Sequence, residues 1–188
     1  MTATGAAPAT GVYVALVRGV NVGGRTLAMA QLRAICTDLG YEDVATYIQS
    51  GNVVLRADAV RARDMAGDLA DAIRDRAGMQ VAVIVREARQ LRAVCEANPF
   101  AERSDQGRLY VTFLAGLARD VEISPDAGPP DEFVAGDGVV YVWCAGGYGR
   151  TILNNQFFER RLGVSATTRN WRTVSRLAEM AASLAVVG

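Results

Sequence analysis

The sequence predicts an α+β protein of two tandem ferredoxin-like (split βαβ) domains with antiparallel or mixed sheets. Residues 11–87 show the order strand-helix-strand-strand-helix-strand that is typical of this unit. Residues 88–188 repeat the theme less regularly, as a second ferredoxin-like α/β domain. A chain of 188 residues with 51% hydrophobic and 21% charged residues is ordinary for folded domains of this size. Element order alone supports the tandem arrangement, because the halves share no direct sequence repeat.

The first domain follows a tail, residues 1–10, that we expect to be disordered. Its helices are indicated by apolar residues three or four positions apart, such as Met65, Leu69 and Ile73, and by a glycine where each helix ends. Both helices of such a unit lie on one face of the sheet, so the other face is solvated or covered by further elements. The expected elements are a strand 12–17, a helix from about 28, strands 44–49 and 53–56 joined as a hairpin, a helix 61–77 and a strand 80–85.

The second domain is expected to contain a strong strand, a hairpin and three helices. Pro99 ends the first helix, because the residue before a proline is biased away from helical conformation. Gly136-Asp137-Gly138 is a typical hairpin turn. The expected elements are a helix 88–97, a strand 108–115, a loop 120–130, strands 132–135 and 139–145, a helix 153–162, a strand 166–170 and a helix 171–184.

Composition excludes several kinds of chemistry. The chain has no histidine, which removes Ser-His and Cys-His nucleophile pairs and every His-bearing metal site. Its three cysteines have neither zinc-site nor disulfide spacing, so we expect no metal and no cofactor. The N-terminus lacks the features of a signal peptide, and no apolar run approaches the ~18–20 residues that span a bilayer. We therefore expect a cytoplasmic protein without membrane contact. The sequence does not indicate the oligomeric state.

A glycine-rich turn follows the first strand. Residues 19–26 match the phosphate-binding loop pattern except that Arg25 replaces its lysine. We reject nucleotide hydrolysis, because the following helix starts too late and the sheet is not parallel. Clustered backbone N–H groups in such a turn still bind anions without a lysine. The candidate ligand-binding residues here are Arg18, Asn21, Gly23 and Gly24; the alternative is a tight connection with no ligand.

Two further polar clusters supply candidate residues. Gln49, Ser50 and Asn52 surround the first hairpin turn, where ordinary turn chemistry is the alternative explanation. We expect this hairpin tip and the glycine-rich turn at opposite ends of their strands. Residues 148–176 hold six arginines against one carboxylate, Glu159, with amides and aromatic rings among them. Arginine beside aromatic rings suits phosphates, carboxylates and stacked bases. The candidates in this segment are Arg150, Asn154, Asn155, Thr168, Arg169, Asn170 and Trp171.

Four of these stretches together resemble a known family. Residues 18–24, 47–53, 98–100 and 166–171 read RGVNVGG, YIQSGNV, NPF and ATTRNW. In this order they are similar to the bacterial domain of unknown function 1697, over about residues 12–184. The resemblance implies a cytosolic protein of two ferredoxin-like domains and implies no activity. Arg25 stands where many relatives carry lysine, which keeps the charge.

Four hypotheses about function follow. The leading one is a binding protein, not an enzyme, that holds a small anionic or nucleotide-like ligand through the glycine-rich turn and the Arg/Asn clusters. The second is single-stranded RNA binding on an open sheet face, which zero net charge and 7% aromatic residues weaken. The third is an enzyme that stabilises an oxyanion with arginine and asparagine, although no catalytic residue can be named. In the fourth, the polar clusters only join the two domains. The first hypothesis requires that residues 18–24 and 150–171 line one open cleft.

Overall fold

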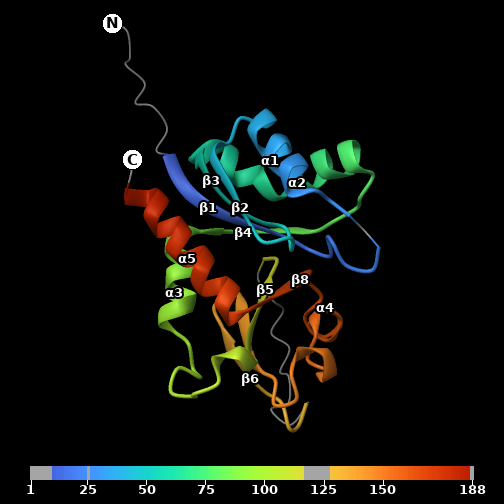
Figure 1. The fold of residues 1–188 in the computed structure, drawn as a ribbon, viewed down its shortest axis with the longest axis vertical. Helices are drawn as coiled ribbons and strands as arrows, with labels where there is room; N and C mark the ends of the chain where they lie inside the picture. The colour runs from blue at the N-terminus through green and yellow to red at the C-terminus, as the bar shows by residue number, and fades with distance from the viewer. Residues whose placement is uncertain (1–9, 25, 117–127, 187–188) are drawn as a thin grey trace, which may run out of the picture.

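The computed structural model describes residues 10–24, 26–116 and 128–186. Figure 1 shows their arrangement. The elements in chain order are β1 (Thr10–Val17), α1 (Met29–Asp38), β2 (Glu42–Tyr47), β3 (Asn52–Asp58), α2 (Ala59–Ala77), β4 (Val83–Glu87), α3 (Ala88–Glu96), the 3-10 helix η1 (Gln106–Arg108), β5 (Leu109–Leu114), β6 (Glu132–Gly136), β7 (Val139–Trp143), the 3-10 helix η2 (Tyr148–Arg150), α4 (Asn155–Leu162), β8 (Ala166–Asn170) and α5 (Trp171–Val186).

The strands form two four-stranded antiparallel sheets. Their orders are β2-β3-β1-β4 and β6-β7-β5-β8, so the two sheets have the same topology. The predicted fold class is confirmed. The last strand of the first sheet begins at Val83 instead of residue 80, because its pairing with β1 ends at the pair Val17–Val83. The predicted tail and most of the predicted loop 120–130 lie outside the described residues.

Local sequence explains how the helices begin and end. The Asp58 carboxylate accepts hydrogen bonds from the backbone N–H groups of Val60 and Arg61, which caps α2. Gly78 ends this helix at φ 65°, a left-handed conformation that glycine adopts without strain. Glu87, the last residue of β4, forms a capping box with Gln90 at the start of α3. A strand therefore passes directly into a helix at this point.

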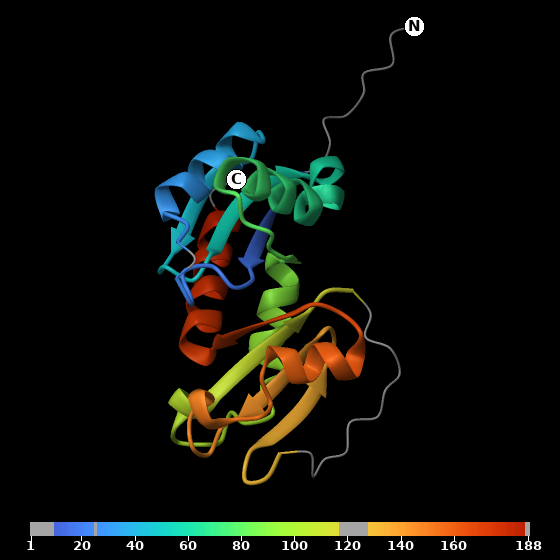
Figure 2. The same cartoon turned by 90° about the vertical axis from the view of Figure 1, so that its right-hand side faces the viewer.

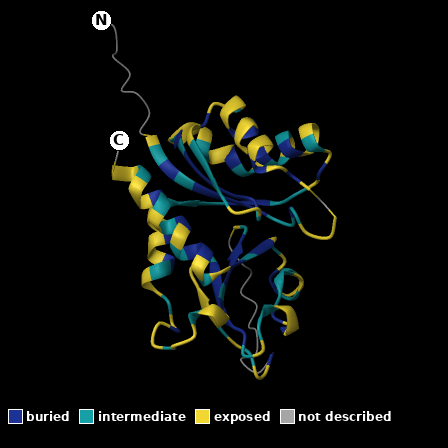
Figure 3. Ribbon diagram, in the orientation of Figure 1, coloured by how far each residue is buried: buried dark blue, intermediate teal, exposed yellow. Residues whose placement is uncertain are grey.

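The helices form three layers around the two sheets. Helices α1 and α2 cover the outer face of the first sheet, and α4 packs on the outer face of the second. Helices α3 and α5 lie side by side in the angle between the sheets and pack against the inner face of each (Figure 1, Figure 2). Figure 3 shows the buried strands between these more exposed helices. The sheet face that the first domain leaves open is thus covered by α3 and α5.

One hydrophobic cluster joins the two halves. It combines Val14 and Ile84 of the first sheet with Val111 and Phe113 of the second, and Leu177 of α5 packs among them. The boundary predicted at residues 87 and 88 falls between β4 and α3, and α3 contributes Leu91 and Val94 to the same cluster. No helix in the described part of the chain is long and apolar enough to cross a membrane.

The two halves correspond closely at the ends of their first strands. The N–H of Val17 donates to Gly51 O (2.8 Å), and the N–H of Leu114 at the end of β5 donates to Gly138 O (3.0 Å). One residue further, Arg18 donates to Ala82 O and Ala115 to Ser165 O, both at 2.8 Å. A helix also follows directly after the last strand of each sheet, α3 after β4 and α5 after β8. The same hydrogen bonds thus recur at equivalent positions in both halves.

Candidate functional site

The glycine turn, residues 19–24, lies beside the tip of the β2–β3 hairpin. The Asn21 amide donates to Gln49 O (2.6 Å) and to Leu27 O (3.0 Å), while its carbonyl accepts the Leu27 N–H (2.8 Å). The prediction that turn and hairpin lie at opposite ends was therefore wrong. β1 and β2 both run antiparallel to β3, so they are parallel to each other and end at the same edge of the sheet.

Gly51 lets the hairpin approach the turn closely. A Cβ at this position would lie 2.5 Å from Val20 Cγ2 and 2.9 Å from Val17 Cβ, closer than carbon atoms pack. Its φ of +71° also disfavours any larger residue. Glycine at this position of the hairpin is therefore required by packing against β1 and the glycine turn.

Arg169 of β8 joins the second half to this hairpin and to β1. Its Nε donates to Asn52 Oδ1 (2.5 Å), and its Nη2 donates to the carbonyl oxygens of Val17 (2.9 Å) and Ser50 (3.0 Å). Its Nη1 donates to Thr167 Oγ1 (2.7 Å) and Thr168 O (2.9 Å). We call Arg169 and these acceptors the Arg169 cluster. Since a guanidinium has five N–H donors, none is left for a ligand.

The Arg169 cluster is buried and holds a charge without a carboxylate partner. Arg169 is 8% exposed and Asn52 is 0% exposed. Burial lowers the pKa of Arg169 to about 10, which still leaves the guanidinium charged at neutral pH. Asn52 is also fully bonded, because its amide donates to Tyr47 O (3.0 Å) and Ser50 Oγ (2.9 Å). These groups therefore connect the two halves and are not open to solvent.

Three other predicted residues of the Arg-rich segment, Thr168, Asn154 and Asn155, lie on the α4 side of β8. Side chains alternate along a strand, so Thr168 points away from the Arg169 cluster. Thr168 Oγ1 donates to Asn155 Oδ1 (2.6 Å) and also bonds Thr112 Oγ1 (2.8 Å). Asn154 caps α4 by accepting the Phe157 N–H (3.1 Å). Thr168 and Asn155 therefore lie across β8 from the Arg169 side chain, so the predicted residues of this segment do not all line one cleft.

Three further candidates lie at the start of α5 and in η2. Asn170 accepts the Thr173 N–H (2.8 Å), as a capping residue does. Trp171 packs against the cluster that joins the halves. Arg150 is exposed, and its guanidinium donates no hydrogen bond to a described residue. The guanidinium of Arg150 thus has unused donors on the surface.

Arg18 has spare hydrogen-bond donors next to the glycine turn. Its Nε donates to Ala166 O (3.0 Å) and its Nη2 to Glu159 Oε2 (2.7 Å), so both Nη1 N–H groups donate to no described residue. The other carboxylate oxygen of Glu159 accepts the Ala166 N–H (2.9 Å). An open hollow of about 460 Å³ adjoins Arg18, Glu159 and residues 163–165.

The glycine turn presents unused backbone donors. The φ angles of Gly19 (70°), Asn21 (56°), Gly23 (59°) and Gly24 (83°) are positive, while those of Val20 and Val22 are not. None of the N–H groups of residues 19–24 donates to a described residue. Successive N–H groups with alternating backbone conformation form the concave arrangement that binds anions. Asn21 and the buried Val20 fix this turn in place.

Sequence reasoning missed Arg86, in β4. Its Nη2 donates to Leu114 O (2.7 Å) and Gly138 O (2.8 Å), which lie in the second half. Arg86 is the last residue but one of a strand that passes directly into a helix, as Arg169 is. That shared position was the signal in the sequence.

The described residues offer no obvious catalytic group. They contain no group of three or more His, Cys, Asp and Glu side chains placed to hold a metal. Burial raises the pKa of Cys36 to about 12 and those of Cys95 and Cys144 to about 11, so none is a thiolate at neutral pH.

Comparison with known proteins identifies the family. The model of the family described as "Protein of unknown function (DUF1697)" matches residues 11–141. The chain belongs to the DUF1697 family. A solved structure similar to this DUF1697 protein is that of the conserved bacterial protein SP0830 from Streptococcus pneumoniae. The two share 22% sequence identity and a TM-score of 0.70, over 92% of this chain and 99% of the other. This likeness concerns the fold. No curated protein matches the chain.

Proposed function

We propose that this protein binds a small anion, such as the phosphate or carboxylate group of a metabolite, at the glycine turn. The observation that carries the proposal is the row of N–H groups in residues 19–24 that donate to no described residue, with positive φ at every second residue from Gly19 to Gly23. Arg18 adds charge-assisted donors immediately beside the turn.

In this proposal the Arg169 cluster positions the turn and does not touch the ligand. Arg169 binds the carbonyl oxygens of Val17 and Ser50, and Asn21 links the turn to the same hairpin through Gln49. A turn that is already ordered loses little conformational entropy when an anion binds. In this proposal the clusters predicted from the sequence have two roles. The exposed glycine turn binds the anion, and the buried Arg169 cluster holds the turn in position.

The structure gives no support to the RNA-binding and enzymatic alternatives. Binding of single-stranded RNA requires an open sheet face with stacking aromatic rings. Helices cover the central strands of both sheets, and the Tyr110 ring is already stacked on Tyr148, with centroids 4.7 Å apart. Arg169 and Asn52 are unable to stabilise an oxyanion, because their donors are all used inside the protein.

A matched pair of substitutions at Val22 tests the proposal. Val22 is 59% exposed within the turn, so Val22→Asp and Val22→Asn remove little packing and differ from each other only in charge. We expect V22D to weaken the binding of inorganic phosphate at least fivefold, because a carboxylate within about 5 Å repels the anion by about 1 kcal/mol or more. V22N is expected to bind as the wild type does. Isothermal titration calorimetry at fixed ionic strength measures both. Equal affinities for V22D and V22N, or no binding by the wild type at millimolar phosphate, would contradict the proposal.

A further inference from the structure

Arg86 and Arg169 occupy equivalent positions in the two halves. Each is the fourth residue of a five-residue strand, and they pair with Val14 of β1 and Val111 of β5 respectively. Arg169 Nη2 donates to Val17 O, at the end of β1, and Arg86 Nη2 donates to Leu114 O, at the end of β5. Each arginine therefore donates to the carbonyl oxygen at the end of the first strand in the opposite sheet.

The two arginines differ in what their remaining N–H groups contact. Asn52, which accepts from Arg169 Nε, pairs with Leu16, and the equivalent pair in the second half is Val139 with Phe113. Valine has no acceptor. The Nε–H of Arg86 accordingly donates to no described residue. One Nη1 N–H donates to Val85 O (2.9 Å), and the other Nη1 N–H donates to no described residue.

Arg86 combines an accessible unused donor with a place in the wall of a cavity. No buried side-chain nitrogen or oxygen of the described residues lacks a hydrogen-bond partner, so Arg86 Nε, which donates to no described residue, is not fully buried. Arg86 lines a cavity of about 510 Å³ between α3 and the β6–β7 hairpin. The size is typical of sites for small molecules. Much of the remaining wall is apolar and includes Val94, Val134, Val139 and the ring of Tyr141.

We infer that this cavity binds a small monocarboxylate with an apolar body. One carboxylate oxygen accepts from Arg86 Nε, as Asn52 Oδ1 does from Arg169. The hydrocarbon part lies against Val94 and Val134, which removes apolar surface from water. Asp137 lies on the exposed rim and repels negative charge, which favours a singly charged ligand over a phosphate dianion. The inference is independent of the proposed function, because the cavity shares no residue with the glycine turn.

Hexanoate and its neutral amide, hexanamide, are the probes for this site. Calorimetry of the full chain is expected to show saturable binding of hexanoate, with hexanamide at least tenfold weaker. Ala93, an exposed residue of α3 that lines the cavity, provides a variant that spares the hydrogen bonds of Arg86. We expect Ala93→Glu to weaken hexanoate binding at least tenfold and Ala93→Gln, of equal size and without charge, to change it less than threefold.

Three outcomes would overturn the inference: no saturable binding of hexanoate, equal binding of hexanamide, or A93E binding as tightly as A93Q. The V22D variant separates this site from the glycine turn. Hexanoate binding that V22D abolishes and A93E leaves intact would place the carboxylate at the turn and contradict the cavity assignment. Loss of phosphate binding in V22D with hexanoate binding retained would support both sites.

Discussion

Replacing Arg169 by Met is expected to lower the free energy of unfolding by about 3–5 kcal/mol. The substitution removes hydrogen bonds from a charged donor, each worth about 1.5–3 kcal/mol, and leaves buried acceptors such as Asn52 Oδ1 and Val17 O without partners. Relief of the desolvated charge offsets part of this loss. Urea denaturation followed by circular dichroism measures the change through the midpoint at constant slope.

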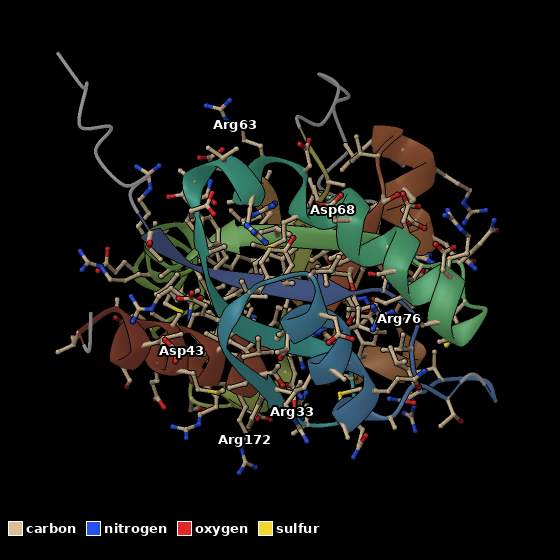
Figure 4. The ribbon with its side chains drawn as sticks, turned by 90° about the horizontal axis from the view of Figure 1, so that it is seen from above. Arg33, Asp43, Arg63, Asp68, Arg76 and Arg172 are labelled. Atoms are coloured by element: carbon tan, nitrogen blue, oxygen red, sulfur yellow. The ribbon has the colours of Figure 1, made fainter. Side chains whose placement is uncertain are left out.

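Two further variants make this prediction specific to the hydrogen bonds. Arg169→Lys keeps the charge but has three donors in place of five, so we expect an intermediate loss of about 2–3 kcal/mol. Arg172 is exposed and projects away from the molecule (Figure 4), so Arg172→Met should change stability by less than about 0.5 kcal/mol. Were R169M to cost less than about 1 kcal/mol, the Arg169 cluster would not hold the halves together.

The substitution Gly51→Ala should lower the free energy of unfolding by a similar amount, about 2–5 kcal/mol. A methyl group at Gly51 collides with Val20 Cγ2 at 2.5 Å and Val17 Cβ at 2.9 Å, and overpacking of this kind costs about 1–3 kcal/mol. The left-handed backbone adds about 1–2 kcal/mol for any residue with a Cβ. Thermal and urea unfolding of the variant measure the sum.

Gly78 is the matched control for Gly51. It also has a positive φ, +65°, but a Cβ there meets no atom within 4 Å. Gly78→Ala therefore isolates the backbone contribution of about 1–2 kcal/mol. If the two alanine variants lost the same stability, close contact between the hairpin and the glycine turn would not explain why glycine stands at position 51.

The two sheets could be predicted because their signals are local. Hydrophobic periodicity, glycine stops and hairpin turns each lie within one element or between neighbours, and they gave the strand and helix order of both halves. The placement of α3 and α5 between the sheets has no such signal. Their apolar faces, including Leu91 and Leu177, indicate burial but do not identify the surface that covers them.

The candidate site was harder to predict, because its decisive contacts join distant residues. Asn52 and Arg169 are 117 positions apart. The residues next to each of them in the sequence do not indicate that the two side chains are in contact. Strand alternation alone would have placed Thr168 and Arg169 on opposite faces and argued against a single cleft. Likewise, the parallel directions of β1 and β2 would have brought the glycine turn and the hairpin tip together.

The most direct test of anion binding at the glycine turn is a phosphate titration followed by backbone amide NMR, at ionic strength held constant with chloride. We expect saturable shifts concentrated in the N–H resonances of residues 19–24, with one common dissociation constant. The buried Arg169 side-chain Nε–H should remain at its position throughout, because the ligand does not touch it. Shifts absent from residues 19–24, or centred on Arg169 and Asn52, would contradict the assignment of the turn as the binding element and of the Arg169 cluster as its support.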